Sequence, residues 1–274
     1  MFKRTLTGAG YIAVLVGFFL LREFIDTRLF HILTCFLLIV GTIEVSNAVK
    51  EYVPKILRVI AIMESALAVP IYCAFNYLIT CGKGFLAVGL LIVIGIVFVS
   101  IYAVIVKNGF KRTLPWLLPF VYPLTLLLFM MLANDSGKGF IILLLSFVVS
   151  PLSDTFAYLV GSLIGGKKLC PKLSPKKTWS GAIGGTVGGA LGALVVYLIF
   201  KPSINFPSPV LFFILIGLIA SVVNVFGDLF ESYVKRRVNI KDMGKILPGH
   251  GGIMDRIDGT SFVIVFIYLA FLFV

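Results

Sequence analysis

The chain has 274 residues, of which 59% are hydrophobic and 13% are charged, and its mean hydropathy is +1.08. One soluble core of this length cannot bury so much apolar surface, so the composition excludes an ordinary soluble domain and predicts an all-α, polytopic integral membrane protein. The net charge of +12 is typical of basic cytoplasmic loops; basic residues spread over loops do not indicate a nucleic-acid partner.

Nine apolar runs predict a bundle of about nine transmembrane helices, since roughly 20 helical residues cross a hydrocarbon core about 30 Å thick. The runs are continuous and do not alternate with polar residues, which favours helices over a β-barrel. The first run follows MFKR and lacks a small-x-small cleavage site, so we expect it to be retained. The expected spans cover residues 5–21, 28–46, 57–79, 84–106, 114–133, 139–161, 181–200, 209–230 and 257–274.

The distribution of Lys and Arg predicts how these spans are oriented. If the N-terminus is cytoplasmic, 19 of the 24 basic residues lie on the cytoplasmic side and 5 on the opposite side. We therefore expect a multi-pass protein of the cell inner (cytoplasmic) membrane, with its two most basic loops facing the cytoplasm. The five basic residues expected on the opposite side are Arg22, Arg28, Lys83, Lys138 and Lys201.

Polar residues divide the chain into two predicted regions. Residues 1–137 form about five N-terminal spans, and residues 138–274 form a C-terminal catalytic region with a polar cavity facing the cytoplasm. Within the first region, Glu44 and Glu64 are intramembrane carboxylates, which are costly and usually have a partner. Each of them could either form hydrogen bonds between helices or line a polar cavity, and the sequence does not decide between these two roles.

The first polar cluster covers residues 153–181. Asp154 falls toward the cytoplasmic end of the sixth span, where it can face a cavity. Residues 161–168, GSLIGGKK, nearly match a phosphate loop, but Lys168 replaces the Ser or Thr that would hold Mg²⁺ and a transmembrane helix precedes the motif. We therefore exclude a phosphate-loop fold. A glycine-rich turn remains, and it leads into Lys172, Lys176 and Lys177. Thr178 and Ser180 follow and could donate hydrogen bonds to phosphate oxygens. A lysine run of this kind is, by itself, more often only a positive-inside loop.

The seventh span carries two interleaved rows of glycine at four-residue spacing. Such rows allow helix backbones to approach closely in lipid, which favours packing over ligand contact. The rows are Gly181, Gly185, Gly189 and Gly184, Gly188, Gly192.

The densest polar cluster is the segment 227–259, which holds eleven of the chain's 36 charged residues between two apolar runs. Asp228 lies at the cytoplasmic end of the eighth span, whereas Asp255 and Asp258 are neighbours at the start of the last one. Carboxylates surrounded by Lys and Arg suit a hard cation that carries a polyphosphate. The alternative is a set of interfacial salt bridges.

The run SYVKRRVNIKDMGKILPGHGGIMDRID, residues 232–258, resembles the signature of phosphatidate cytidylyltransferases, also called CDP-diacylglycerol synthases. The pieces SDTFAYLVG and SPKKTWSG resemble the same family, so the likeness covers residues 153–259 well and the N-terminal third only by hydropathy. The matching signature positions are Ser232, Lys235, Arg236, Lys241, Asp242, Gly244, Pro248, His250, Gly251, Gly252, Asp255, Arg256 and Asp258.

The resemblance implies that CTP and phosphatidic acid give CDP-diacylglycerol and pyrophosphate at a membrane, with Mg²⁺ required; Mn²⁺ and a second cation are left open. A homodimer is a further expectation. On the likeness, Asp228 and Asp255 hold the metal, and Asp258 and Asp154 bind metal or orient a lysine. His250 contacts a phosphate or the leaving pyrophosphate. The residues expected to neutralise or contact the substrates are Lys176, Lys177, Thr178, Ser232, Lys235, Arg236, Lys241, Asp242 and Arg256.

Two other functions fit the same residues less well. A CTP-dependent polyprenol kinase would use the same metal logic but transfer the terminal phosphoryl group. A transporter of an anionic solute would use intramembrane charges and broken helices without consuming CTP.

Overall fold

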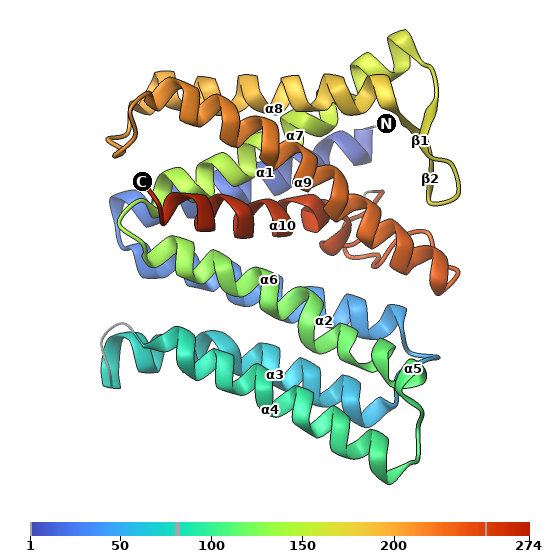
Figure 1. The fold of residues 1–274 in the computed structure, drawn as a ribbon. Coiled ribbons are helices and arrows are strands. Elements are labelled where there is room, and N and C mark those ends of the chain that lie inside the picture. Colours follow the sequence, from blue (N-terminus) through green and yellow to red (C-terminus); the bar gives the residue numbers. More distant parts are fainter. Residues whose placement is uncertain (1, 80–82, 250) are drawn as a thin grey trace. The chain divides into compact units, whose positions relative to one another are not determined.

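The structure, a computed structural model, describes residues 2–79, 83–249 and 251–274 (Figure 1). These ranges contain nine helices of 18 residues or more, which confirms the predicted all-α membrane bundle. The apolar runs form helices because lipid offers backbone N–H and C=O groups no other partners. The long helices are α1 (Phe2–Phe24), α2 (Phe30–Ala48), α3 (Lys55–Cys73), α4 (Gly84–Ile105), α6 (Leu118–Asp135), α7 (Gly139–Ile164), α8 (Trp179–Phe200), α9 (Pro209–Arg237) and α10 (Met254–Phe271).

The remaining regular elements are short. α5 (Phe110–Thr113) precedes α6, and a π-helical segment, Ala74–Ile79, continues α3. Among the described residues, eight helices are long and apolar enough to cross a membrane. The ninth predicted span corresponds to α10, whose first two turns carry Asp255, Arg256 and Asp258.

By packing, the chain divides into two compact units. Unit 1 consists of Met1–Leu132 and Ile240–Asp255, and unit 2 consists of Ala133–Asn239 and Arg256–Val274. Unit 1 therefore includes a loop that follows α9 in the sequence. The expected functional division after residue 137 did not anticipate that this loop packs with the N-terminal helices.

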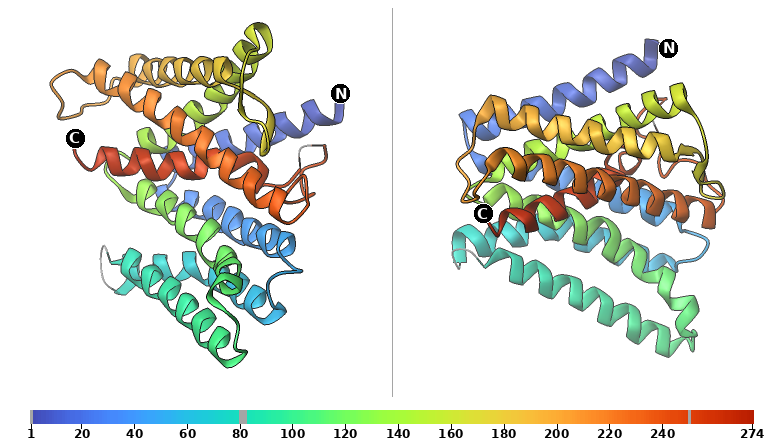
Figure 2. Two further views of the ribbon diagram at one scale, coloured as in Figure 1. Left: turned by 45° about the vertical axis from the view of Figure 1, so that its right-hand side comes forward. Right: turned by 45° about the horizontal axis from the view of Figure 1, so that its top comes forward.

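Unit 2 is built on α7, α8, α9 and most of α10. α8 and α9 lie side by side in both views of Figure 2. The direction of α8 against α7 follows from its glycines, because Gly181 lies over Ala157 whereas Gly192 lies over Leu152. Ring contacts between Phe226 and Phe262 and between Phe213 and Phe271 join α9 to α10 in the same antiparallel sense.

The two glycine rows of α8 are packing surfaces. A Cβ atom at Gly185 would lie 2.9 Å from the carbonyl oxygen of Ser153, and one at Gly188 would lie 2.5 Å from the Cβ of Phe156. Glycine thus brings the backbones of α7 and α8 into direct contact. Contacts within the chain thus occupy both rows.

We expect Gly185→Val to destabilise unit 2, because the neighbouring carbonyl of α7 belongs to the backbone and cannot rotate away. The cost should be about 1–3 kcal/mol, the usual penalty of overpacking a tight contact. Thermal unfolding in detergent, followed by size-exclusion chromatography, measures the effect. Gly17→Val in α1 is the control, since no described atom lies within 4 Å of a Cβ placed there. Equal melting temperatures for the two variants would contradict the packing role.

A β-hairpin that the sequence did not predict connects α7 to α8. β1 (Lys168–Cys170) pairs with β2 (Ser174–Thr178) in antiparallel register. The turn out of α7 uses Gly165 and Gly166, whose φ angles of 66° and 102° favour glycine. At the other end, the Thr178 hydroxyl accepts a hydrogen bond from the N–H of Gly181 at 3.1 Å and caps α8.

Polar contacts hold the N-terminal helices of unit 1 together. Thr42 on α2 and Ser65 on α3 share a hydrogen bond of 2.6 Å, and Glu64 on α3 packs directly over Gly95 on α4. The structure thus places Glu64 at the contact between α3 and α4.

Candidate functional site

Unit 2 contains a cavity of about 440 Å³ between α7, the hairpin, α8 and α9. Its wall combines acidic side chains from two helices with lysines from the hairpin, next to apolar and small residues of α7 and α8. The polar lining residues from these elements are Asp154, Ser162, Lys168, Lys176, Lys177, Thr178 and Asp228. The structure thus brings together two sequence clusters that lie about 50 residues apart.

The two acids of the cavity wall have defined partners. Asp154 on α7 accepts a hydrogen bond of 2.8 Å from the side-chain amide of Asn224 on α9. Asp228, one turn further along α9, forms an ion pair with Lys177 of the hairpin. Its other oxygen accepts a hydrogen bond of 3.2 Å from the hydroxyl of Ser232. The wall therefore holds one carboxylate bonded to an amide and one paired with a lysine.

Asp258 on α10 brings a third carboxylate to this part of unit 2. It interacts electrostatically with Asp228 and Asp154, and Lys235 partly offsets the repulsion. Its own carboxylate accepts the N–H of Gly259 at 2.7 Å. Three carboxylates from three helices thus share one region, which concentrates negative charge and favours the binding of cations.

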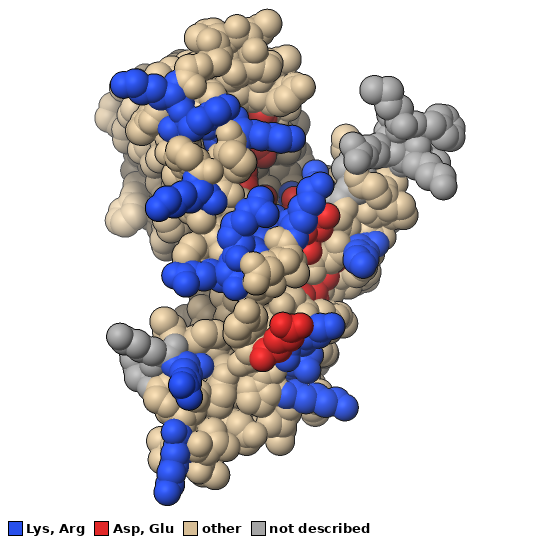
Figure 3. Space-filling model, turned by 90° about the vertical axis from the view of Figure 1, so that its right-hand side faces the viewer, with Lys and Arg blue, Asp and Glu red and all other residues tan. Residues whose placement is uncertain are grey.

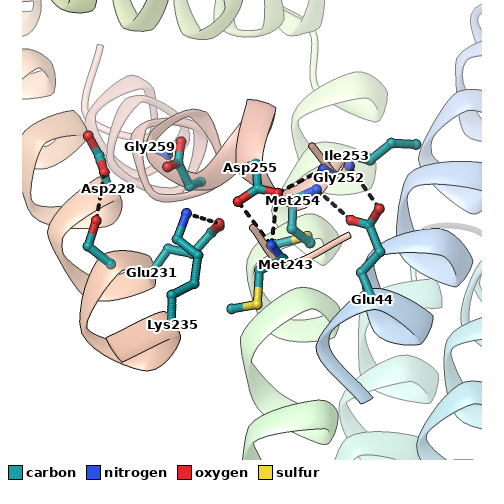
Figure 4. Close-up of polar contacts among 12 residues, drawn as sticks. Glu44, Asp228, Glu231, Lys235, Met243, Gly252, Ile253, Met254, Asp255 and Gly259 are labelled. Atoms are coloured by element: carbon teal, nitrogen blue, oxygen red, sulfur yellow. Dashed lines mark hydrogen bonds and ion pairs between the residues drawn. The ribbon is translucent and has the colours of Figure 1, made fainter. Parts of the chain in front are cut away.

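Lys235 is held by an acid that lies wholly inside the protein. Glu231 is 0% exposed, and its Oε1 accepts a hydrogen bond of 3.0 Å from the Lys235 ammonium one helical turn away (Figure 4). Lys235 itself is 14% exposed, so its position is set by this pair. An ammonium group fixed in this way can bind an anionic group of a ligand while it keeps its position.

The remaining predicted basic residues lie at the surface. Arg236 is exposed and its guanidinium donates a hydrogen bond of 3.5 Å to the carbonyl of Leu173 in the hairpin, and Arg256 is exposed at the start of α10. Figure 3 shows Lys and Arg side chains standing out from the surface, with acidic side chains set deeper beside some of them. This is the arrangement that attracts polyanions.

Unit 1 holds the other part of the predicted signature. Asp255 receives hydrogen bonds from the backbone N–H groups of Met243, at 2.9 Å, and Gly252, at 2.8 Å (Figure 4). The carboxylate therefore organises its own loop, whatever else it binds. Lys241 and Asp242 are exposed in the same loop, and His250 lies outside the described residues.

The donor set suits a hard cation. Carboxylate oxygens of Asp154, Asp228 and Asp258 are the ligand type that Mg²⁺ prefers. Among the described residues, however, no three acidic, His or Cys side chains stand close enough to form a complete protein cluster for a metal. A Mg²⁺ ion bound with a nucleotide commonly takes only one or two protein carboxylates, and substrate phosphates complete its shell.

Three features escaped the sequence analysis. The hairpin has no apolar alternation, so its strands gave no signal. Asn224 was overlooked, although a polar residue one helical turn before Asp228 in an apolar run is itself an indication of a site. The burial of Glu231 depends on neighbouring helices and no local pattern reveals it.

Comparison with known proteins identifies a family. The model of the cytidylyltransferase family matches residues 2–274. A protein of Bacillus subtilis named phosphatidate cytidylyltransferase is 36% identical over 140 residues, 51% of each chain. A protein of the same name from Brucella abortus is 37% identical over 139 residues, which are 51% of this chain and 50% of the relative. Another from Staphylococcus saprophyticus is 35% identical over 136 residues, which are 50% of this chain and 51% of the relative.

The chain spans about half the length of the relatives it matches. The family model, by contrast, extends over both units, including the N-terminal helices for which the sequence offered only a likeness in hydropathy. Together with the acidic and basic groups that unit 2 gathers around its cavity, this match shows that the chain belongs to the cytidylyltransferase family.

Proposed function

We propose that this chain is a phosphatidate cytidylyltransferase, which transfers CMP from CTP to phosphatidic acid and releases pyrophosphate. The observation that carries the proposal is the cavity of unit 2, where Asp154 and Asp228 face Lys176 and Lys177. The name shared by the relatives supports the choice of CTP and phosphatidate over polyprenol phosphorylation or transport.

In the proposed reaction, an oxygen of the phosphatidate phosphate attacks the α-phosphorus of CTP. The new O–P bond forms as the bond from the α-phosphorus to the bridging oxygen breaks, and pyrophosphate leaves with the electron pair. A phosphate monoester is largely ionised near neutral pH, since its second pKa is about 6. The attacking oxygen therefore needs no strong general base, and positioning and charge neutralisation dominate.

The basic residues supply that neutralisation. We assign Lys177 and Lys176 of β2 to phosphate oxygens in the cavity, and Lys235 to the charge that develops on the leaving group. Lys177 exchanges its contact with Asp228 for a phosphate when substrate arrives. Lys235, which Glu231 holds in place, is the preorganised cation of this set and costs no reorganisation during the reaction.

Mg²⁺ is the cofactor we propose, because its oxygen ligands are present and the nucleotide is a polyphosphate. When bound, the ion neutralises phosphate charge and makes the α-phosphorus more electrophilic. Asp228 is the ligand we assign to it in unit 2. The prediction that Asp255 is a second ligand stands on the family resemblance.

The cytoplasmic side is the proposed side of the site. With a cytoplasmic N-terminus, Lys176 of the hairpin and Lys235 in the last turn of α9 fall on the basic side of the membrane, where CTP is available. Phosphatidate would enter from the bilayer. A multi-pass protein with a polar cavity near its helix ends serves both substrates.

The test is a reaction of purified protein in detergent with phosphatidate, Mg²⁺ and CTP labelled at either the α- or the γ-phosphate. We expect the α-label in lipid and the γ-label in pyrophosphate, with no turnover when phosphatidate is omitted. The γ-label in lipid would replace the proposal by a lipid kinase. No consumption of CTP with any lipid acceptor would support a transporter.

A further inference from the structure

Glu44 lies in the membrane-spanning helix α2, yet its carboxylate contacts the backbone of a distant loop. Its Oε1 accepts the N–H of Ile253 at 3.0 Å, and its Oε2 accepts the N–H of Met254 at 2.9 Å (Figure 4). The side chain is 3% exposed. Both oxygens of an intramembrane carboxylate are thus committed to two consecutive backbone groups of unit 1.

These groups belong to the start of α10. The first N–H groups of a helix have no acceptor inside the helix, and the residues Gly252 and Ile253 that precede α10 carry no side-chain acceptor. Glu44 supplies the missing cap from another helix. A carboxylate at this end also interacts favourably with the helix dipole, and a hydrogen bond to a charged acceptor is stronger than one between neutral groups.

Two glycines of the signature make room for this carboxylate. A Cβ atom at Gly252 would lie 2.5 Å from Oε2 of Glu44, and one at Gly244 would also collide with the same carboxylate. Both glycines approach Glu44 more closely than any side chain allows. Glu44 therefore occupies a slot that the loop closes from two sides.

The same loop holds Asp255. Its carboxylate binds the N–H of Gly252, while Glu44 binds the next two N–H groups along the chain. We propose that Glu44 is a positioning residue, which fixes the loop 240–255 and with it the orientation of Asp255. The effect of this positioning on catalysis rests on the proposed function. The family signature lies wholly outside α2, so nothing in it includes Glu44.

The test compares Glu44→Gln with the wild type as full-length protein in detergent. The amide nitrogen of Gln cannot accept a hydrogen bond, so one of the two N–H groups loses its partner. We expect hydrogen–deuterium exchange at residues 252–254 to be about tenfold faster, the effect of losing roughly 1.4 kcal/mol. We also expect kcat to fall about tenfold with little change in the KM for CTP.

Glu64→Gln is the matched control, because Glu64 is another buried carboxylate of unit 1 but packs against α4. It should leave exchange at residues 252–254 unchanged. Unchanged exchange in Glu44→Gln would overturn the positioning role. If exchange rises but the wild type transfers no CMP to phosphatidate, the positioning role stands and the proposed function fails.

A second comparison serves if Glu44→Gln does not fold. Gly252→Ala should lower the melting temperature strongly in the wild type, because its methyl group collides with Glu44. The same substitution should lower it much less when Glu44 is already Ala. Equal decreases in the two backgrounds would overturn the inference.

Discussion

Asp228→Asn should reduce the turnover of CTP with phosphatidate by at least about 100-fold, the usual scale for removing a group that acts on the charge of a transition state. Asn keeps the size of the side chain: its amide oxygen can still accept from Lys177, and its amide nitrogen can donate to the Ser232 hydroxyl. The substitution removes the negative charge of the side chain that we propose as a ligand of Mg²⁺. The measurement is pyrophosphate release at saturating CTP over a series of Mg²⁺ concentrations.

Asp26→Asn is the control for this substitution. Asp26 uses one oxygen to accept the N–H of Arg28 at 2.7 Å, and Asn preserves that contact. Its activity should match the wild type, and both variants should melt at the wild-type temperature. A folded Asp228→Asn protein with wild-type turnover would remove Asp228 from the mechanism.

The ion pair with Lys177 offers a purely structural explanation for Asp228, and a double variant distinguishes it. If the two residues only neutralise each other, Asp228→Asn combined with Lys177→Met should be nearly as active as the wild type. If each contacts substrate or metal, the double variant should be no more active than Asp228→Asn alone. We expect the second result, because both side chains line the cavity.

The sequence predicted the helices well because membrane burial depends on local hydropathy. Lipid forces an apolar run of about 20 residues into a helix, whatever its neighbours are. α10 was the weakest case, since Asp255, Arg256 and Asp258 reduce its apolar length. The glycine rows of α8 likewise predicted close packing, because the spacing places the glycines on surfaces that a neighbouring helix can approach closely.

The grouping of the site residues could be predicted only in part. Residue types and the family signature singled out Asp154, Asp228 and Lys177, yet the ion pair between the last two depends on a hairpin with no local sequence signal. The sequence also could not decide whether Glu44 bonds to another helix or lines a polar cavity, because its contacts have no local sequence signal. Its partners are backbone N–H groups more than 200 residues away, and the pattern of α2 carries no information about them.

Glu231→Ala should be among the most destabilising single substitutions in unit 2. It removes a carboxylate that is 0% exposed and leaves the Lys235 ammonium, which is 14% exposed, without that counter-charge. Breaking a buried ion pair from one side costs about 3–5 kcal/mol. The measurement is thermal unfolding in detergent, with Glu51→Ala as the control because Glu51 is exposed between α2 and α3.

The double variant Glu231→Ala with Lys235→Met then separates stability from chemistry. Replacing both charges of a buried pair by apolar groups is often neutral, so the melting temperature should recover most of its loss. Activity should stay low, because we assign the Lys235 ammonium to the leaving group. Recovery of both would mean that Lys235 only balances Glu231. Failure of the melting temperature to recover would mean that Glu231 is stabilised by contacts other than this ion pair.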